Sequence, residues 1–170
     1  MFCMGIWLAG SVFITVVATQ NFFTIDRLLE GSSNGVFKAL VATMESPTAR
    51  ELMRYASSEL NRLYFQYWNI VQLVVGMAAL RLVSRLPGSK HATWGIAAML
   101  FVVLFLMVFI TPPIIRIGRD LDFMPRDPVP PQMRTFGLLH ATYSAFTIVI
   151  VVLGILVTLW IQKEQPSQDS

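Results

Sequence analysis

Four long runs of apolar residues constrain the fold of this chain more than any other feature. Residues 1–25, 63–80, 92–110 and 136–162 contain no Asp, Glu, Lys or Arg. A helix needs about 20 mostly apolar residues to cross a bilayer, and these runs do not alternate between polar and apolar residues as barrel strands do. We therefore predict an all-α integral membrane protein, a four-helix bundle with helices at about 2–25, 61–83, 92–111 and 136–161.

The composition also points to a membrane protein. Of the 170 residues, 55% are hydrophobic and 14% are charged, whereas soluble domains average about 25% charged residues. The net charge of +3 is typical of loops that face an anionic leaflet, so the expected partner is the lipid bilayer and not nucleic acid. We expect one domain over residues 1–162 and a disordered polar tail over 163–170.

Lys and Arg are unevenly divided between the two ends of the predicted bundle. Side A carries both termini and the short connection between the second and third helices, and side B carries the two long connections. Nine of the 13 Lys and Arg residues fall on side B and four on side A. The positive-inside rule then places side B in the cytoplasm of a plasma or inner membrane, with both termini outside. Trp7, Trp94 and Trp160 fall near side A, where indole rings favour the membrane interface.

The two long connections differ in character. In the first, we expect the first helix to continue to a stop at Gly31 and a short amphipathic piece to follow over 36–44. Ser46 and Pro47 then start a helix that can run without a breaker into the second span. In the second connection, Thr111-Pro112-Pro113 is expected to end the third helix, because proline lacks an N–H donor. The rest, to Arg134, is predicted to be an extended, charged loop.

A polar stripe on the second helix is the most informative candidate for function. The stripe consists of Arg62, Gln66, Asn69, Gln72 and Gly76. At 100° per residue these positions fall on about one third of the helix circumference. Polar side chains inside a bilayer normally face the bundle interior or a wet cavity, and the fourth helix offers a matching face that begins at His140. The candidate residues of a polar vestibule open to side B are Glu59, Asn61, Arg62, Gln66, Asn69, Gln72, His140, Ser144 and Thr147.

Two interpretations of this stripe stay open. Amide and small side chains often only join transmembrane helices, with about 1 kcal/mol for each interhelical hydrogen bond. Intramembrane polar groups also mark binding cavities. No Asp or Glu lies deep in a predicted span, although proton-coupled transporters commonly need one there.

The sequence predicts neither a cofactor nor a metal site. His91 and His140 lie at opposite ends of the predicted bundle, roughly 30 Å apart, so one monomer cannot use both as ligands of a single metal or haem. A haem with one histidine ligand, or a site shared between subunits, is the alternative. The single cysteine, Cys3, excludes a disulfide framework.

Three short motifs resemble one known family. They are Trp7-x-x-Gly10 in the first helix, Asn61-x-x-Tyr64-Phe65 at the start of the second, and Phe136-Gly137-Leu138-Leu139-His140 at the start of the fourth. In this order they resemble the transmembrane-protein-205-like family of four-helix membrane proteins, over about residues 4–161. The fourth helix departs from the family pattern at Ala141, Tyr143 and Thr147. The resemblance implies a multi-pass membrane protein, directs attention to His140 and supplies no reaction.

These observations lead to two main functional expectations. Signatures of hydrolases, nucleotide-binding proteins and zinc proteases are absent from the sequence, so we expect a protein that is not an enzyme. The first expectation is that it binds or passes a small solute or metal species through the vestibule. The alternative is an accessory subunit of a larger respiratory or photosynthetic complex, or a homo-oligomer, because residues 92–110 are apolar on every face. A third hypothesis is an electron carrier that binds haem or quinone.

Overall fold

The computed structural model describes residues 1–44 and 46–164. Every regular element in this part of the chain is helical. The elements are α1 (Phe2–Gly31), α2 (Gly35–Ala42), α3 (Ser46–Val83), α4 (Lys90–Phe105), the π-helical turn η1 (Leu106–Ile110), α5 (Thr111–Asp120) and α6 (Gln132–Glu164). Residues 165–170 of the predicted tail lie outside the described residues, and residues 163–164 belong to α6.

Four helical stretches are long and apolar enough to cross a membrane. They are Phe2–Gly31, Pro47–Val83, Lys90–Asp120 and Gln132–Lys163. Large apolar side chains such as Phe13, Val74 and Phe101 are exposed along them, which suits a lipid environment and would be costly in water. The prediction of an all-α membrane protein with four spanning-length helices is confirmed.

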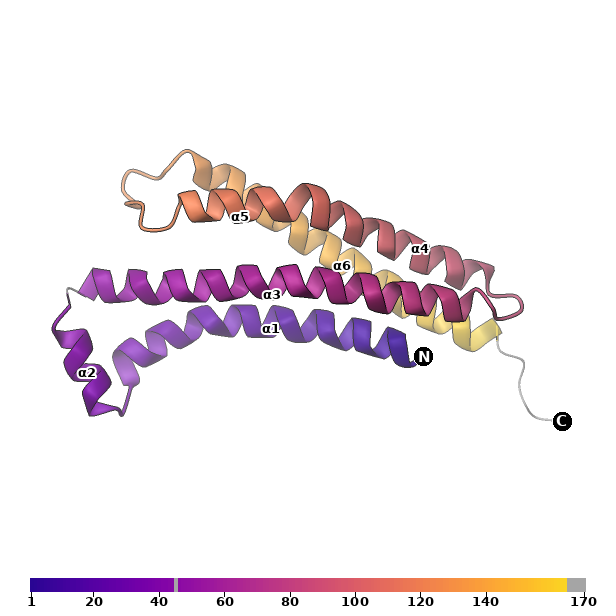
Figure 1. Cartoon of the computed structure of the whole chain (residues 1–170), viewed down its shortest axis with the longest axis horizontal. Coiled ribbons are helices and arrows are strands. Elements are labelled where there is room, and N and C mark those ends of the chain that lie inside the picture. The colour runs from indigo at the N-terminus through magenta and orange to yellow at the C-terminus, as the bar shows by residue number, and fades with distance from the viewer. Residues whose placement is uncertain (45, 165–170) are drawn as a thin grey trace.

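The ends of the long helices gather at the two opposite ends of the bundle (Figure 1). The N-terminus, the end of α3, the start of α4 and the end of α6 lie together, and α2 and the connection after α5 lie at the opposite end. Along the bundle, α1 packs on α3, α3 on α4, and α4 on α6. The ends correspond to the predicted sides A and B, and these names are kept below.

The first long connection is built as its sequence predicts. Helix α1 continues to Gly31, and the Asn34 side chain caps α2 by accepting a hydrogen bond from the Phe37 backbone N–H at 3.0 Å. Helix α3 then runs without interruption from Ser46 to Val83. It therefore extends well past its apolar part on side B, and this extension carries the charged residues discussed below.

The prediction that the third helix ends at its prolines is wrong. The helical path continues through Pro112 and Pro113 to Asp120, and the π-helical turn Leu106–Ile110 directly precedes them. A proline ring clashes with the carbonyl group four residues earlier in a regular helix, and for both prolines that carbonyl lies in η1. The wider turn rearranges these carbonyls, and the prolines then occupy the first turn of α5, where a missing N–H has no cost.

The α1–α3 contact depends on two tryptophans that pack on two glycines. Trp7 of α1 lies against Gly76 of α3, where an added Cβ would come within 2.6 Å of the indole ring. Trp68 of α3 lies against Gly10 of α1 in the same way. Trp7 is fully buried, so the expectation that it faces the membrane interface is wrong, whereas Trp94 is 75% exposed. Because glycine has no side chain, the helix backbones approach closely enough to enclose each ring.

Candidate functional site

A groove of about 730 Å³ opens between α1 and α6. Near side A the two helices touch, since a Cβ on Gly154 would lie 2.6 Å from Leu8 Cδ2. Toward side B they separate, with α6 beside α5 and α1 on the other side of α3 (Figure 1). Helices α3 and α5 contribute Phe65 and Ile114 to the lining of the groove. The groove is therefore closed toward side A and widens toward side B.

The groove is mostly apolar, and its polar side chains gather toward side B. Val12, Val16 and Val152 line it nearer side A, and Arg62 and His140 line it nearer side B. Five hydroxyl groups along the α1 and α6 walls donate to the carbonyl oxygen four residues earlier in their own helix, at 2.9 to 3.0 Å. These residues are Ser11, Thr15, Thr19, Ser144 and Thr147. With their protons engaged in this way, the hydroxyls tolerate an apolar neighbour.

A second, smaller pocket of about 270 Å³ adjoins the groove on side B. The two cavities share Phe22, Ser58, Arg62 and Phe136 as lining residues. The smaller pocket also takes residues from the connection after α5, which include Asp122 and Arg126. A ligand longer than the groove would reach this pocket past Arg62.

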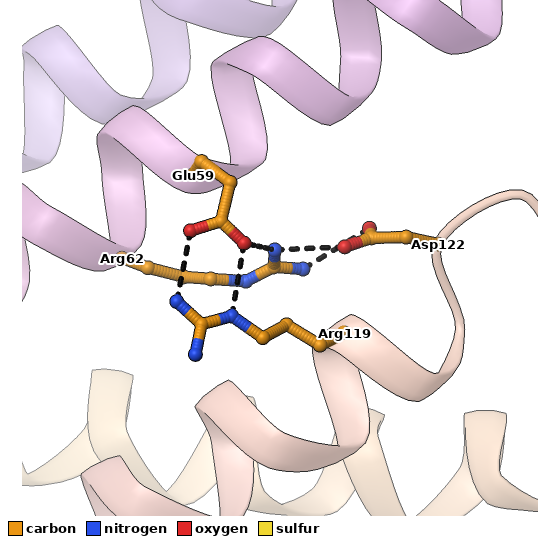
Figure 2. A network of polar contacts seen from close by, with 4 residues as sticks. All are labelled: Glu59, Arg62, Arg119 and Asp122. Carbon is orange, nitrogen blue, oxygen red and sulfur yellow. Dashed lines mark hydrogen bonds and ion pairs between the residues drawn. The ribbon is translucent and has the colours of Figure 1, made fainter.

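Arg62 lies at the centre of a four-residue ion-pair network (Figure 2). Its guanidinium donates to Glu59 Oε1 at 2.6 Å and to the two carboxylate oxygens of Asp122 at 2.8 and 3.1 Å. Arg119 of α5 donates to both oxygens of Glu59 at 3.0 Å. The side chains of Arg62 and Asp122 are only 11% and 15% exposed. Two cations and two anions balance, and the network holds α3 to α5 on side B.

Three of the predicted polar residues join helices through hydrogen bonds of their side chains. Asn61 donates to the carbonyl oxygen of Ala18 at 2.9 Å and accepts from Asn21 at 2.6 Å, which ties α3 to α1. The side-chain oxygen of Gln72 accepts from Trp7 at 2.9 Å. Asn61 also forms part of the groove wall, so it takes part in both roles.

The third is Asn69, which lies at the centre of a buried polar triad. Its amide nitrogen donates to Thr111 Oγ1 and its carbonyl oxygen accepts from the Tyr143 hydroxyl, both at 3.0 Å. Asn69 is fully buried, and the triad links α3, α5 and α6 next to the π-helical turn. The triad closes the inner wall of the groove, where Thr111 and Tyr143 are lining residues.

The remaining predicted residues divide between the groove and the outer surface. His140, Ser144 and Thr147 line the groove, and the His140 ring stacks on Phe136 with centroids 6.1 Å apart. Glu59 lies outside the groove, in the ion-pair network. Gln66 is exposed on the outer face of α3, so it does not join the others.

Sequence reasoning missed several residues that build this site. Asp122 and Arg119 were assigned to an extended loop, and nothing in the local sequence pairs them with residues 60 positions earlier. Tyr143 and Thr111 were overlooked as polar residues inside the bundle. A signal existed for Tyr143, because it lies three residues after His140 on the same predicted face.

The described residues contain no group of three His, Cys, Asp or Glu side chains that could hold a metal ion. Fold and site together define a four-helix membrane protein with a lateral groove and an adjoining charged pocket. No family model, no curated protein and no solved structure matches this chain.

Proposed function

We propose that this membrane protein binds a small amphipathic solute in the groove between α1 and α6 and catalyses no reaction on it. The observation that supports the proposal is the groove itself, with an apolar part toward side A and a polar part toward side B. Its volume of about 730 Å³ lies within the range of roughly 300–1,000 Å³ that small-molecule sites occupy.

Binding accounts for the geometry better than passage through the bundle. On the side A half the interior is filled by tightly packed residues, including the fully buried Trp7, Ile96 and Met99. A Cβ on Gly95 would lie 2.5 Å from Val157, so α4 and α6 are also in close contact there. A solute that enters from side B or from the side therefore meets a closed end.

A pair of tryptophan substitutions on α6 tests the proposal. Ser144→Trp puts a large ring into the groove, and Ala145→Trp puts the same ring on an exposed position outside it. Both variants are reconstituted in phosphatidylcholine nanodiscs and titrated with radiolabelled hexadecanol and palmitate. We expect saturable binding of at least one probe, lost in Ser144→Trp and unchanged in Ala145→Trp. Equal binding by both variants, or no saturable binding to the unsubstituted protein, would contradict the proposal.

His140 provides a second test of the same site. We expect His140→Ala to change the affinity for the solute without lowering the amount of protein in the membrane. The His140 ring lines the groove, and its ring contact is with Phe136 of the same helix. Thr142→Ala serves as the control, since Thr142 bonds to its own helix and lies outside the groove. A fall in abundance alone would indicate a packing role for His140.

The accessory-subunit alternative is tested by extraction of the tagged chain from its native membrane in mild detergent. Other polypeptides present at fixed stoichiometry would make the chain a subunit and would overturn a freestanding role.

We also propose kinship with the transmembrane-protein-205-like family. In support, Trp7 and Gly10 belong to the α1–α3 contact and Phe136 stacks on His140. An experimental structure of a family member without these contacts would count against it.

A further inference from the structure

We infer that the solute is a single-chain amphiphile with an anionic head, taken up from the membrane leaflet on side B. Its hydrocarbon chain lies in the groove between α1 and α6, and its head lies in the adjoining pocket beside Arg54 and Arg126. This inference rests on the proposed function and adds the chemical class of the ligand.

The two cavities adjoin each other and differ in polarity. Arg62 and Phe136 line both of them, so an extended molecule can occupy the groove and the pocket together. The groove presents mainly apolar side chains, and wall hydroxyls such as those of Thr15 and Thr147 are bonded to their own helices. The pocket is the more polar of the two and lies at the membrane surface, where α3 and α5 extend past their apolar parts. A long apolar chain with one polar head matches this division.

The charges in the pocket select the sign of the head. Glu59, Arg62, Arg119 and Asp122 neutralise one another in the ion-pair network. The other charged lining residues of the pocket are Arg54, Arg126 and Glu51. They carry two positive charges and one negative charge, so the pocket without a ligand has an excess of one positive charge.

Arg54 and Arg126 have no anionic partner among residues 1–44 and 46–164. Arg54 makes no ion pair with a described residue, and Arg126 donates only a 3.5 Å bond to the sulfur of Met133. Arginine pairs with carboxylate and phosphate through two parallel hydrogen bonds. An anionic head that enters the pocket therefore meets two arginines whose donors are available, and these arginines come from α3 and from the connection after α5.

The size and the direction of the opening favour one chain drawn from the leaflet. The groove opens sideways between α1 and α6, and exposed Val12, Phe23 and Ile148 flank the opening. Exposed apolar side chains of this kind mark surfaces that contact a membrane or another apolar partner, so we infer that lipid chains have access to the opening. The groove volume of about 730 Å³ is that of a site for one small molecule, so we assign it a single hydrocarbon chain.

Palmitate and hexadecanol separate the contribution of the head from that of the chain. The two probes share the same chain, and only palmitate is anionic. We expect the unsubstituted protein in phosphatidylcholine nanodiscs to bind palmitate at least about tenfold more tightly than hexadecanol, because only the carboxylate head forms charge-assisted hydrogen bonds with arginine. The Arg54→Gln/Arg126→Gln double variant should lose this preference and bind hexadecanol unchanged.

A matched double variant controls for the general charge of side B. Arg116→Gln/Arg134→Gln removes the same charge from exposed positions that line neither cavity, and it should retain the preference for palmitate. Equal affinity for the two probes, or the same loss in both double variants, would overturn the anionic head site and leave the groove proposal standing. If Ser144→Trp does not reduce the binding of either probe, the groove proposal fails together with the inference.

Discussion

The indole N–H of Trp7 donates a 2.9 Å hydrogen bond to the side-chain oxygen of Gln72, and this bond crosses the buried contact between α1 and α3. Trp7 is fully buried and Gln72 nearly so. The ring of Trp7 also packs on Gly76, one turn further along α3. One residue thus supplies both the apolar and the polar part of the contact, and it does so close to the closed end of the groove.

Loss of this hydrogen bond should weaken the bundle by a measurable amount. Gln72→Leu leaves the Trp7 N–H buried without a described acceptor, and we expect the free energy of unfolding to fall by about 1 kcal/mol, the usual size for such bonds in membranes. Gln66→Leu is the control, because Gln66 is exposed on the same helix and should change stability by less than about 0.5 kcal/mol. Equal effects in a detergent unfolding titration would show that the bond contributes nothing.

Close helix approach at the glycines should not tolerate a methyl group. A Cβ on Gly76 would lie 2.6 Å from both Leu100 and Trp7, so we expect Gly76→Ala to cost about 1–3 kcal/mol through overpacking. Gly137→Ala on α6 meets nothing within 4 Å and should stabilise its helix slightly, because alanine favours helix formation. Thermal unfolding of both variants in the same detergent checks the sign of each change. An unchanged midpoint for Gly76→Ala would mean that α1 and α3 can separate at little cost.

The ion-pair network should depend on the partners of Arg62. Asp122→Asn removes the negative charge and replaces one of the two oxygens that accept from Arg62 by an amide nitrogen. Because the Arg62 side chain is only 11% exposed, we expect a loss of about 1–3 kcal/mol. Asp120→Asn, a neutral change at an exposed carboxylate nearby, should have little effect. The comparison is made by proteolysis at the connection after α5, which should become faster only in Asp122→Asn. Equal proteolysis rates in the two variants would show that the Arg62–Asp122 ion pair does not hold α3 to α5.

The orientation of the bundle is open to direct labelling. In a Cys3→Ser background, Ser33→Cys lies on side B between α1 and α2, and Ser84→Cys lies on side A after α3. The excess of Lys and Arg on side B predicts that a membrane-impermeant maleimide added to intact cells labels position 84 and not position 33. The reverse pattern would place both termini in the cytoplasm.

Local signals in the sequence determined the number and the order of the long helices and the two ends of the first long connection, but not the continuation of the third helix to Asp120 or the start of α6 at Gln132. Runs without charge fix where a chain can cross a bilayer, and the Gly31–Gly35 turn and Asn34 mark where α1 ends and α2 begins. The sequence also placed His140, Ser144 and Thr147 on one helix face, because a spacing of three and four residues is a property of the helix alone.

Only the tertiary structure decided which polar residues meet. The sequence could not separate Gln72, which bonds to Trp7, from Gln66, which is exposed, because both belong to one broad stripe and the neighbouring helix covers only part of it. It could not show that Arg62 of α3 meets Asp122 in the connection after α5. Nor could it show that a π-helical turn lets the third helix continue past its prolines. Such contacts depend on how closely helices approach and where they diverge, and the same divergence of α1 from α6 creates the groove.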